Sequence, residues 1–176
     1  MPYYYGPEGN ETQTELTLMS THLLNMQSSL IPYGNNAGWS ASSIRDYLNN
    51  RLYNGINSLW RPLIKQINVA SDTRKDGSIS SMFTKDYIFI PSARELIESS
   101  TYLSSDSAPT SHGCFDIFVD NEARKCTLPG SNTALTYWTR SARANSALYW
   151  LYVSTTGSVT STSSDSSYYI RIMLAI

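Results

Sequence analysis

The last third of the chain constrains the fold most, because it reads as a succession of short strands separated by turn residues. The strand-like stretches are "ALTYWTRSA" (134–142), "ALYWLYVST" (147–155), "SVTSTS" (158–163) and "YYIRIMLAI" (168–176). Thr156 and Gly157, between the second and third stretches, predict a hairpin turn. In the last stretch Ile170, Ile172 and Leu174 alternate with other residues and are expected on one face of a strand. A chain that ends in this way has to build a β-sheet.

Two amphipathic helices are predicted earlier in the chain, over "WSASSIRDYLNNRLYNGI" (39–56) and "NSLWRPLIKQI" (57–67). Apolar residues recur at helical spacing in both: Ile44, Tyr47, Leu48 and Leu52 in the first, and Leu59, Leu63, Ile64 and Ile67 in the second. A serine at 40 or 42 caps the first helix, and Asn54 with Gly55 ends it. Pro62 lies near the start of the second helix, where a proline is tolerated. We expect both helices to pack beside the sheet.

Shorter elements and long loops account for the rest. We expect a strand running into a turn or short helix at 15–24, and a polar loop with a hairpin around Asp76 and Gly77. A buried strand follows at 86–92, and then a short helix at 92–99 that begins with a capping box of Ser92 and Glu95. The segment 99–113 is expected to be a loop and 114–120 a strand. This order predicts an α+β fold in which two amphipathic helices pack beside an antiparallel sheet. Residues 1–14 are predicted to be a loop or arm, and 15–176 a single domain.

Charge is scarce in this chain. Charged residues make up 15% of it, against about 25% in an average globular protein, and Ser, Thr, Asn and Tyr take their place. The net charge of −1 provides no field that attracts nucleic acid, which argues against a nucleic-acid partner. Such a polar, uncharged profile favours an extracellular, cell-surface or virion location, although the first residues lack the order of a signal peptide. No apolar run approaches about 18 residues, so we expect no membrane insertion.

The two cysteines, Cys114 and Cys126, lie twelve residues apart. A zinc site usually needs a closer pair and more partners, so one disulfide or two free thiols remain as open alternatives. His112 precedes Cys114 by two residues, and "HGC" can be read as a nucleophile with its base, since residues i and i+2 of a strand share a face. We favour a loop histidine followed by a buried cysteine.

A second cluster, Asp120, Asn121 and Glu122, offers the oxygen ligands that calcium prefers. More often such a cluster is a turn with solvated charge, and we favour that interpretation. We therefore expect no metal and no cofactor.

Four motifs carry a resemblance to a known family: "GWSASSIRDYLNNRLYN", "DYIFIPSARELI", "YWTRSAR" and "YYIRIMLAI", in that order. They resemble a bacterial and phage-associated family of unknown function with "W…S.LR.WLN", "LLS..E", "WWLRSP" and "GVRPA" at corresponding places. The resemblance covers about residues 38–176 and implies a C-type lectin-like fold, which the formylglycine-generating enzyme and the variable proteins of diversity-generating retroelements also use. It further suggests the C-terminal part of a longer protein. Ala142 replaces a proline of the relatives, and Arg171, Ile172 and Met173 replace their "RPA", as in a divergent member.

The resemblance also places a ligand face between Ser141 and Tyr168. The candidate ligand-binding residues in or beside it are Arg143, Asn145, Tyr149, Tyr152, Asp165 and Tyr168. Tyrosine and asparagine suit recognition because they combine aromatic area with adaptable hydrogen bonds. Arg140 is instead expected to be a structural clamp, because an arginine within an aromatic strand most often pairs with a carboxylate or loop carbonyls. Three tryptophans are expected in the core: Trp39, Trp60 and Trp138.

Three functions remain as hypotheses. The first is a non-catalytic recognition module of a surface-displayed or phage virion protein, with a glycan or a surface protein as partner. The second is a structural or oligomerising domain without external ligand, with self-association through a strand edge. The third is a cysteine-dependent enzyme of the formylglycine-generating type. We disfavour it because Cys126 precedes the "YWTRS" strand and Cys114 lies in an earlier predicted strand, so neither is placed where that chemistry needs it. We expect no catalytic residue.

Overall fold

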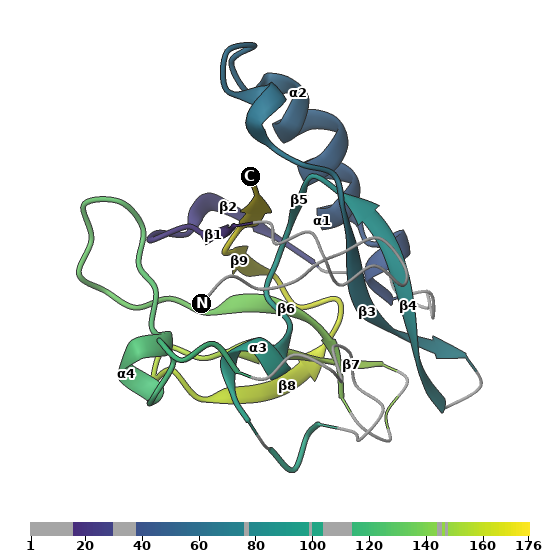
Figure 1. The fold of residues 1–176 in the computed structure, drawn as a ribbon. Helices are drawn as coiled ribbons and strands as arrows, with labels where there is room; N and C mark the ends of the chain where they lie inside the picture. The colour runs from purple at the N-terminus through teal and green to yellow at the C-terminus, as the bar shows by residue number, and fades with distance from the viewer. Residues whose placement is uncertain are drawn as a thin grey trace.

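The computed structural model describes residues 16–29, 38–75, 78–98, 100–103, 114–143, 146 and 148–176. The predicted arm at 1–14, the turn residues Asp76 and Gly77 and most of the predicted loop at 99–113 lie outside these residues. Where the chain is described it is a mixed α+β structure, mostly sheet with a few short helices (Figure 1). The coarse fold class is therefore confirmed.

The strands form three sheets (Figure 1). The five-stranded sheet has the order β2 (Leu24–Ser28), β9 (Tyr168–Ile170), β6 (Tyr137–Ala142), β7 (Tyr149–Val153) and β8 (Val159–Ser163). The three-stranded sheet has the order β1 (Thr17–Met19), β10 (Met173–Ala175) and β5 (Ile88–Phe89), and β3 (Ile67–Lys75) pairs with β4 (Ser78–Asp86). Strands β6 and β9 run parallel, whereas the other named pairs of the described residues are antiparallel. The prediction of a purely antiparallel sheet is wrong at that pair.

The predicted hairpin near the C-terminus is confirmed. Strands β7 and β8 pair in register from Tyr149 opposite Ser163 to Val153 opposite Val159. Gly157 in the turn has a φ of 79°, which favours glycine because a Cβ crowds the backbone there.

The final stretch is divided between two sheets and is not one strand. β9 ends at Ile170 and β10 begins at Met173. Between them the buried Arg171 donates from Nε to the Ser20 carbonyl at 3.1 Å, and the Ile172 amide donates to Ser20 Oγ at 3.2 Å. These bonds interrupt the alternation. Ile170 and Met173 are buried while Ile172 is only half-buried, so the predicted shared face of Ile170, Ile172 and Leu174 is wrong.

The first predicted helix is confirmed as a continuous helical run of α1 (Ser43–Asp46), the π-helical η2 (Tyr47–Leu52) and α2 (Tyr53–Gly55). The Ser42 side chain caps it by accepting from the Arg45 amide at 3.0 Å. Ile44 and Leu48 are fully buried, as their spacing predicts. None of the helices in the described residues is long and apolar enough to cross a membrane.

The second predicted helix is wrong. Residues 57–67 form a turn and the single 3₁₀ turn η3 (Arg61–Leu63), and Ile67 already begins β3. The Asn57 side chain accepts from the Leu59 amide at 2.9 Å and caps this turn, but Pro62 has no amide that could donate to the Ser58 carbonyl and continue a helix. Trp60, predicted to lie in the core, is 66% exposed.

Of the predictions for the shorter elements, some are confirmed and others are wrong. The capping box of α3 (Ala93–Leu96) is present with both reciprocal bonds, and β1 is followed by a turn and then β2. The hairpin predicted around Asp76 and Gly77 is confirmed by the antiparallel pairing of β3 and β4, which runs from Ile67 opposite Asp86 to Lys75 opposite Ser78. The segment around it is strand and not the predicted loop. The predicted strand at 114–120 is a turn that leads into α4 (Asn121–Arg124).

The core lies between the sheets and the helical run. It is a continuous cluster in which Trp39, Trp138 and Trp150 are the largest buried side chains. The prediction that Trp39 and Trp138 are core residues is confirmed.

Candidate functional site

Four of the six predicted ligand residues form two contact pairs in the structure, Arg143 with Tyr149 and Tyr152 with Tyr168. Tyr149 and Tyr152 belong to β7, Tyr168 begins β9, and Arg143 directly follows β6. They are joined by Tyr102, from the segment that follows α3 along the chain. We call these residues the tyrosine face: Tyr102, Arg143, Tyr149, Tyr152 and Tyr168.

Arg143 lies against two of these aromatic rings. Its guanidinium carbon is 5.3 Å from the centre of the Tyr102 ring and 5.6 Å from that of Tyr149. Both distances are within the range of a cation–π interaction. The Arg143 amide also donates to the Tyr149 carbonyl at 3.0 Å, which fixes the backbone next to β7. Tyr149 is 41% exposed, so an external ligand can reach this part of the face.

Tyr152 and Tyr168 form the other part. Their ring centres are 4.6 Å apart, and Tyr168 lies 4.9 Å from the buried ring of Trp138. The Trp138 Nε1 donates to the Ser28 carbonyl at 2.8 Å, so the ring below the pair is fixed. Burial raises the pKa of the Tyr152 hydroxyl, and the hydroxyls of Tyr168 and Tyr102 raise it further. Tyr152 is therefore a neutral hydrogen-bonding group at physiological pH.

The two remaining predicted residues are not part of this arrangement. Asp165 is exposed in the turn between β8 and β9, and the structure records no hydrogen bond, ion pair or ring contact between it and the tyrosine face. Asn145 lies outside the described residues. The roles of Asp165 and Asn145 in ligand binding stay predictions.

Arg140, which lies within β6 three residues before Arg143, is the structural clamp that the sequence predicts. Its guanidinium bonds both oxygens of Glu95, at 2.6 and 2.9 Å, and neither side chain is exposed. The Nε also donates to the Ala70 carbonyl at 2.8 Å. The Ala93 amide donates to Ser141 Oγ at 3.0 Å, which ties β6 to the start of α3. Arg140 is therefore not an anion hook.

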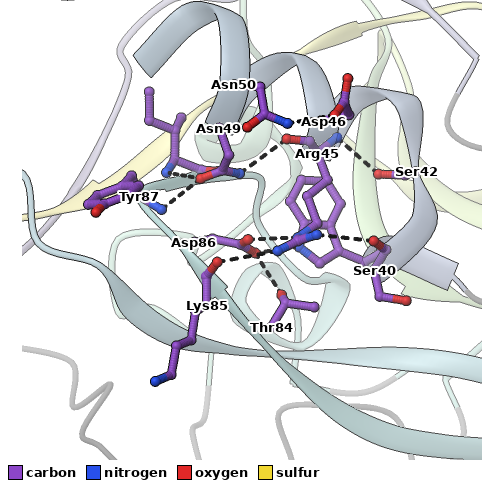
Figure 2. A network of polar contacts seen from close by, with 12 residues as sticks. Ser40, Ser42, Arg45, Asp46, Asn49, Asn50, Thr84, Lys85, Asp86 and Tyr87 are labelled. Atoms are coloured by element: carbon purple, nitrogen blue, oxygen red, sulfur yellow. Dashed lines mark hydrogen bonds and ion pairs between the residues drawn. The ribbon is translucent and has the colours of Figure 1, made fainter. Parts of the chain in front are cut away.

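A second polar cluster joins the helical run to β4 (Figure 2). The fully buried Asp86 accepts from Trp39 Nε1 at 2.8 Å, Arg45 Nε at 2.7 Å and Thr84 Oγ1 at 2.7 Å. Asn49 uses its whole amide on backbone groups, accepting from the Tyr87 and Ile88 amides and donating to the carbonyls of Arg45 and Ile88. These saturated bonds indicate a structural role.

A polar hollow of about 430 Å³ opens above that network. Among the residues that line it, Asp46, Asn50, Gln66 and Lys85 are exposed polar residues and Tyr87 is half-buried. The Tyr87 ring stacks on Tyr53 with 3.9 Å between ring centres.

Cys114, expected to be buried, is half-buried, and Cys126 is buried. Both are free thiols in the structure, so of the two alternatives left open by the sequence, one disulfide or two free thiols, the structure has the second. Cys114 lines a hollow of about 490 Å³ together with Glu98, Asp116 and Arg124. Burial raises the pKa of the Cys114 thiol, with Glu98 and Asp116 adding to the rise and Arg124 opposing it. Burial also raises the pKa of Cys126. His112, the base in the alternative reading, lies outside the described residues.

The acidic cluster at 120–122, which we expected to be a turn with solvated charge, is exposed but forms the N-cap and first residues of the short helix α4. Asp120 Oδ1 accepts from the Ala123 amide at 2.8 Å and caps α4. Asn121 Oδ1 accepts from Arg124, and Glu122 pairs with Lys125. No group of three or more metal-ligating side chains occurs among the described residues.

Residues 14–176 match the family described as "Domain of unknown function (DUF6273)". The chain belongs to this family. No curated protein and no solved structure matches the DUF6273 chain. The motifs predicted membership of an uncharacterised family, and that part of the prediction is confirmed. The relation to the C-type lectin-like fold and the bacterial or phage origin remain predictions.

Sequence reasoning missed Tyr102 of this DUF6273 chain. It is the one member of the tyrosine face that comes from outside the C-terminal strands, and in the sequence it stands in a polar stretch, "SSTYLSSDSAPTSHG". A lone aromatic residue in such a stretch is the only available signal, and it does not indicate a partner 41 residues away along the chain, at Arg143.

Proposed function

We propose that this DUF6273 domain is a non-catalytic recognition module that binds a glycan or a protein at the tyrosine face. The observation that carries the proposal is the placement of Arg143 against Tyr102 and Tyr149, next to the Tyr152–Tyr168 pair. Tyrosine supplies contact area at low entropic cost, and the guanidinium supplies a fork of donors. The motif resemblance and the mixed α+β architecture support a C-type lectin-like fold in a surface-displayed or virion protein of bacterial or phage origin.

The composition of the face favours a ligand with hydroxyl or carboxylate groups around an apolar ring. Partly exposed tyrosine rings can stack on such a ring, and Arg143 can donate to its oxygens while its charge stays delocalised over the flanking rings. Sugars, including acidic ones, combine both features. A protein loop with aromatic and acidic residues is the alternative ligand.

Two observations support a module without catalysis. The raised pKa values of Cys114 and Cys126 keep both thiols protonated at neutral pH, whereas a cysteine nucleophile acts as the thiolate. Arg140 is fully used in holding Glu95 and backbone carbonyls, so it does not stabilise a reacting group.

The test is a binding screen of the purified domain against an array of glycans and bacterial surface material. The variant Tyr149→Ala with Arg143→Ala removes the exposed part of the face and leaves Trp138 and its packed tyrosines in place. Phe83→Ala, at a side chain that is 60% exposed on β4, is the control. We expect the double variant to lose binding and the control to keep it. Equal binding by both variants, or no binding by the wild type, would refute the proposal.

An oligomerising role is the second candidate, because β8 is an edge of the five-stranded sheet and has a strand neighbour on one side only among the described residues. Such an edge can pair with a second copy. Analytical ultracentrifugation distinguishes the two functions: a concentration-dependent dimer without ligand favours the oligomerising role, and a monomer that binds the array favours recognition.

A further inference from the structure

Three large apolar side chains stand exposed next to one another after the helical run. Leu59 is 80% exposed, Trp60 66% and Leu63 52%. We call these three residues the apolar tip. Figure 1 shows the segment around α2 projecting from the rest of the ribbon at the top of the view. Contiguous exposed apolar side chains commonly mark an interaction site.

The backbone of this segment is held in place by hydrogen bonds. Asn57 accepts from the amides of Leu59, through its side chain, and Trp60, through its carbonyl, both at 2.9 Å. The Leu63 amide donates to the Trp60 carbonyl at 3.0 Å, and the buried Ile64 follows directly. The apolar side chains are thus presented outward by a fixed turn.

The sequence on both sides of the apolar tip carries positive charges and no negative ones. Arg51, Arg61 and Lys65 lie in its segment, and the sequence has no Asp or Glu between Asp46 and Asp72. Arg51 and Lys65 are exposed, whereas Arg61 is half-buried and donates to the Asn54 carbonyl. In a chain with a net charge of −1, this is a local excess of positive charge.

We propose that the apolar tip docks on an anionic phospholipid surface, with Trp60 at the level of the headgroups and Leu59 and Leu63 beside it. Tryptophan favours the membrane–water interface, and cations next to it are attracted to anionic lipids. Three side chains expose only a few hundred Å², less than the roughly 800 Å² that each partner buries in a stable protein interface. That small apolar area, together with the charge, favours a lipid surface over a protein partner. Docking at the headgroups needs no membrane-spanning helix.

Tryptophan fluorescence reports directly on this site. Trp39 and Trp138 are 0% exposed and Trp150 is 2% exposed, so a change of solvent at a tryptophan has to come from Trp60. The chain is mixed with vesicles of phosphatidylcholine alone, or of phosphatidylcholine with phosphatidylglycerol. We expect the protein to co-sediment, and its emission to shift to the blue, with the anionic vesicles only. High salt should release the protein from these vesicles, because it screens the electrostatic attraction.

Variants separate the apolar and the electrostatic contributions. Trp60→Ser is expected to lower partitioning about tenfold or more. Arg51→Gln with Lys65→Gln, which removes the two exposed cations, is expected to lower it about thirtyfold, since each cation near the surface contributes about 1 kcal/mol. Trp60→Phe should keep most of the binding and lose the blue shift. Val119→Ser, at a side chain 82% exposed elsewhere, is the matched control and should bind like the wild type.

The proposal is overturned by any of three results: no binding to anionic vesicles, equal binding to neutral ones, or binding that Trp60→Ser leaves unchanged. A Trp60→Ser variant that changes the mass of the particle in solution without affecting vesicle binding also overturns it, and identifies a second copy as the partner. Because the tyrosine face takes no part in this experiment, its outcome is independent of the proposed recognition function.

Discussion

The buried pair of Arg140 and Glu95 gives the sharpest test of what holds this fold together. We consider Glu95→Gln, which removes the negative charge and keeps the shape of the side chain. The glutamine can still accept from the Ser92 amide, now 2.7 Å from Glu95 Oε2, so the capping box loses only part of its strength. The Arg140 guanidinium keeps its neutral carbonyl partners on Ala70 and Ile90 and loses its counter-charge.

The expected cost follows from the burial of both groups. Because neither side chain is exposed, the charge left on Arg140 cannot be hydrated without unfolding. Removing one partner of such a pair typically costs about 3–5 kcal/mol. A domain of this kind has a free energy of unfolding of about 5–15 kcal/mol, so the variant should lose a large part of its stability.

Urea unfolding followed by circular dichroism measures this loss. The matched control is Glu122→Gln, which makes the same chemical change in the ion pair with Lys125, where the Glu122 side chain is 75% exposed. We expect the control to cost less than about 1 kcal/mol, as exposed pairs do. A double variant, Glu95→Gln with Arg140→Gln, should lose less than the sum of the single variants, since it leaves no unpaired charge.

The reasoning is refuted if Glu95→Gln costs no more than Glu122→Gln. The pair would then contribute through shape and neutral hydrogen bonds, and Arg140 would need another explanation. An additive double variant would refute the coupling between the two charges in the same way.

Three further predictions concern other sites. Gly157→Ala should be clearly less stable in thermal unfolding than Gly130→Ala. Both glycines have a positive φ, which costs an alanine about 1–2 kcal/mol, but only at Gly157 would the added Cβ also lie 1.7 Å from a backbone oxygen, that of Asn121. Equal melting temperatures would contradict this. Cys114 should react slowly with a thiol reagent at neutral pH and faster as the pH rises, because burial raises its pKa; fast neutral labelling would contradict it. Burial raises the pKa of the Tyr137 hydroxyl to about 12, above the ordinary 10.0. The stability that the protonated hydroxyl contributes is therefore complete below about pH 10 and is lost as the pH rises toward 12. Between these pH values the free energy of unfolding should fall less steeply in Tyr137→Phe than in the wild type.

Local patterns predict the elements whose bonds are local. The helical run from Ser43, the capping box at Ser92 and the turn at Gly157 each depend on residues within a few positions, and the structure has all three. The errors occur where a distant or competing contact decides. Arg171 interrupts the last strand by bonding to the Ser20 carbonyl, and Ile67, predicted to end the second helix, instead pairs with Asp86 in the β3–β4 hairpin.

The same distinction explains how much of the candidate site the sequence predicts. Tyr149 and Tyr152 lie on one strand, and Tyr168 and Arg143 lie at the ends of strands in the same sheet, so sheet formation alone brings their segments together. Tyr102 reaches them from a segment with no periodicity. Its position is set by tertiary structure, which no pattern in its own neighbourhood reveals.

On and just after β6, the residues that hold the fold lie only a few positions from Arg143, the residue proposed to contact a ligand. Arg140 and Ser141 are buried and anchored to Glu95 and Ala93, whereas Arg143 leaves the strand and lies against partly exposed aromatic rings. A rigid strand that ends beside a binding face limits the freedom of the first residue beyond it, which reduces the entropy lost on binding. Changes at Arg143 should therefore alter ligand affinity with little effect on the free energy of unfolding. Changes at Arg140 should lower the free energy of unfolding, while the molecules that remain folded keep their ligand affinity.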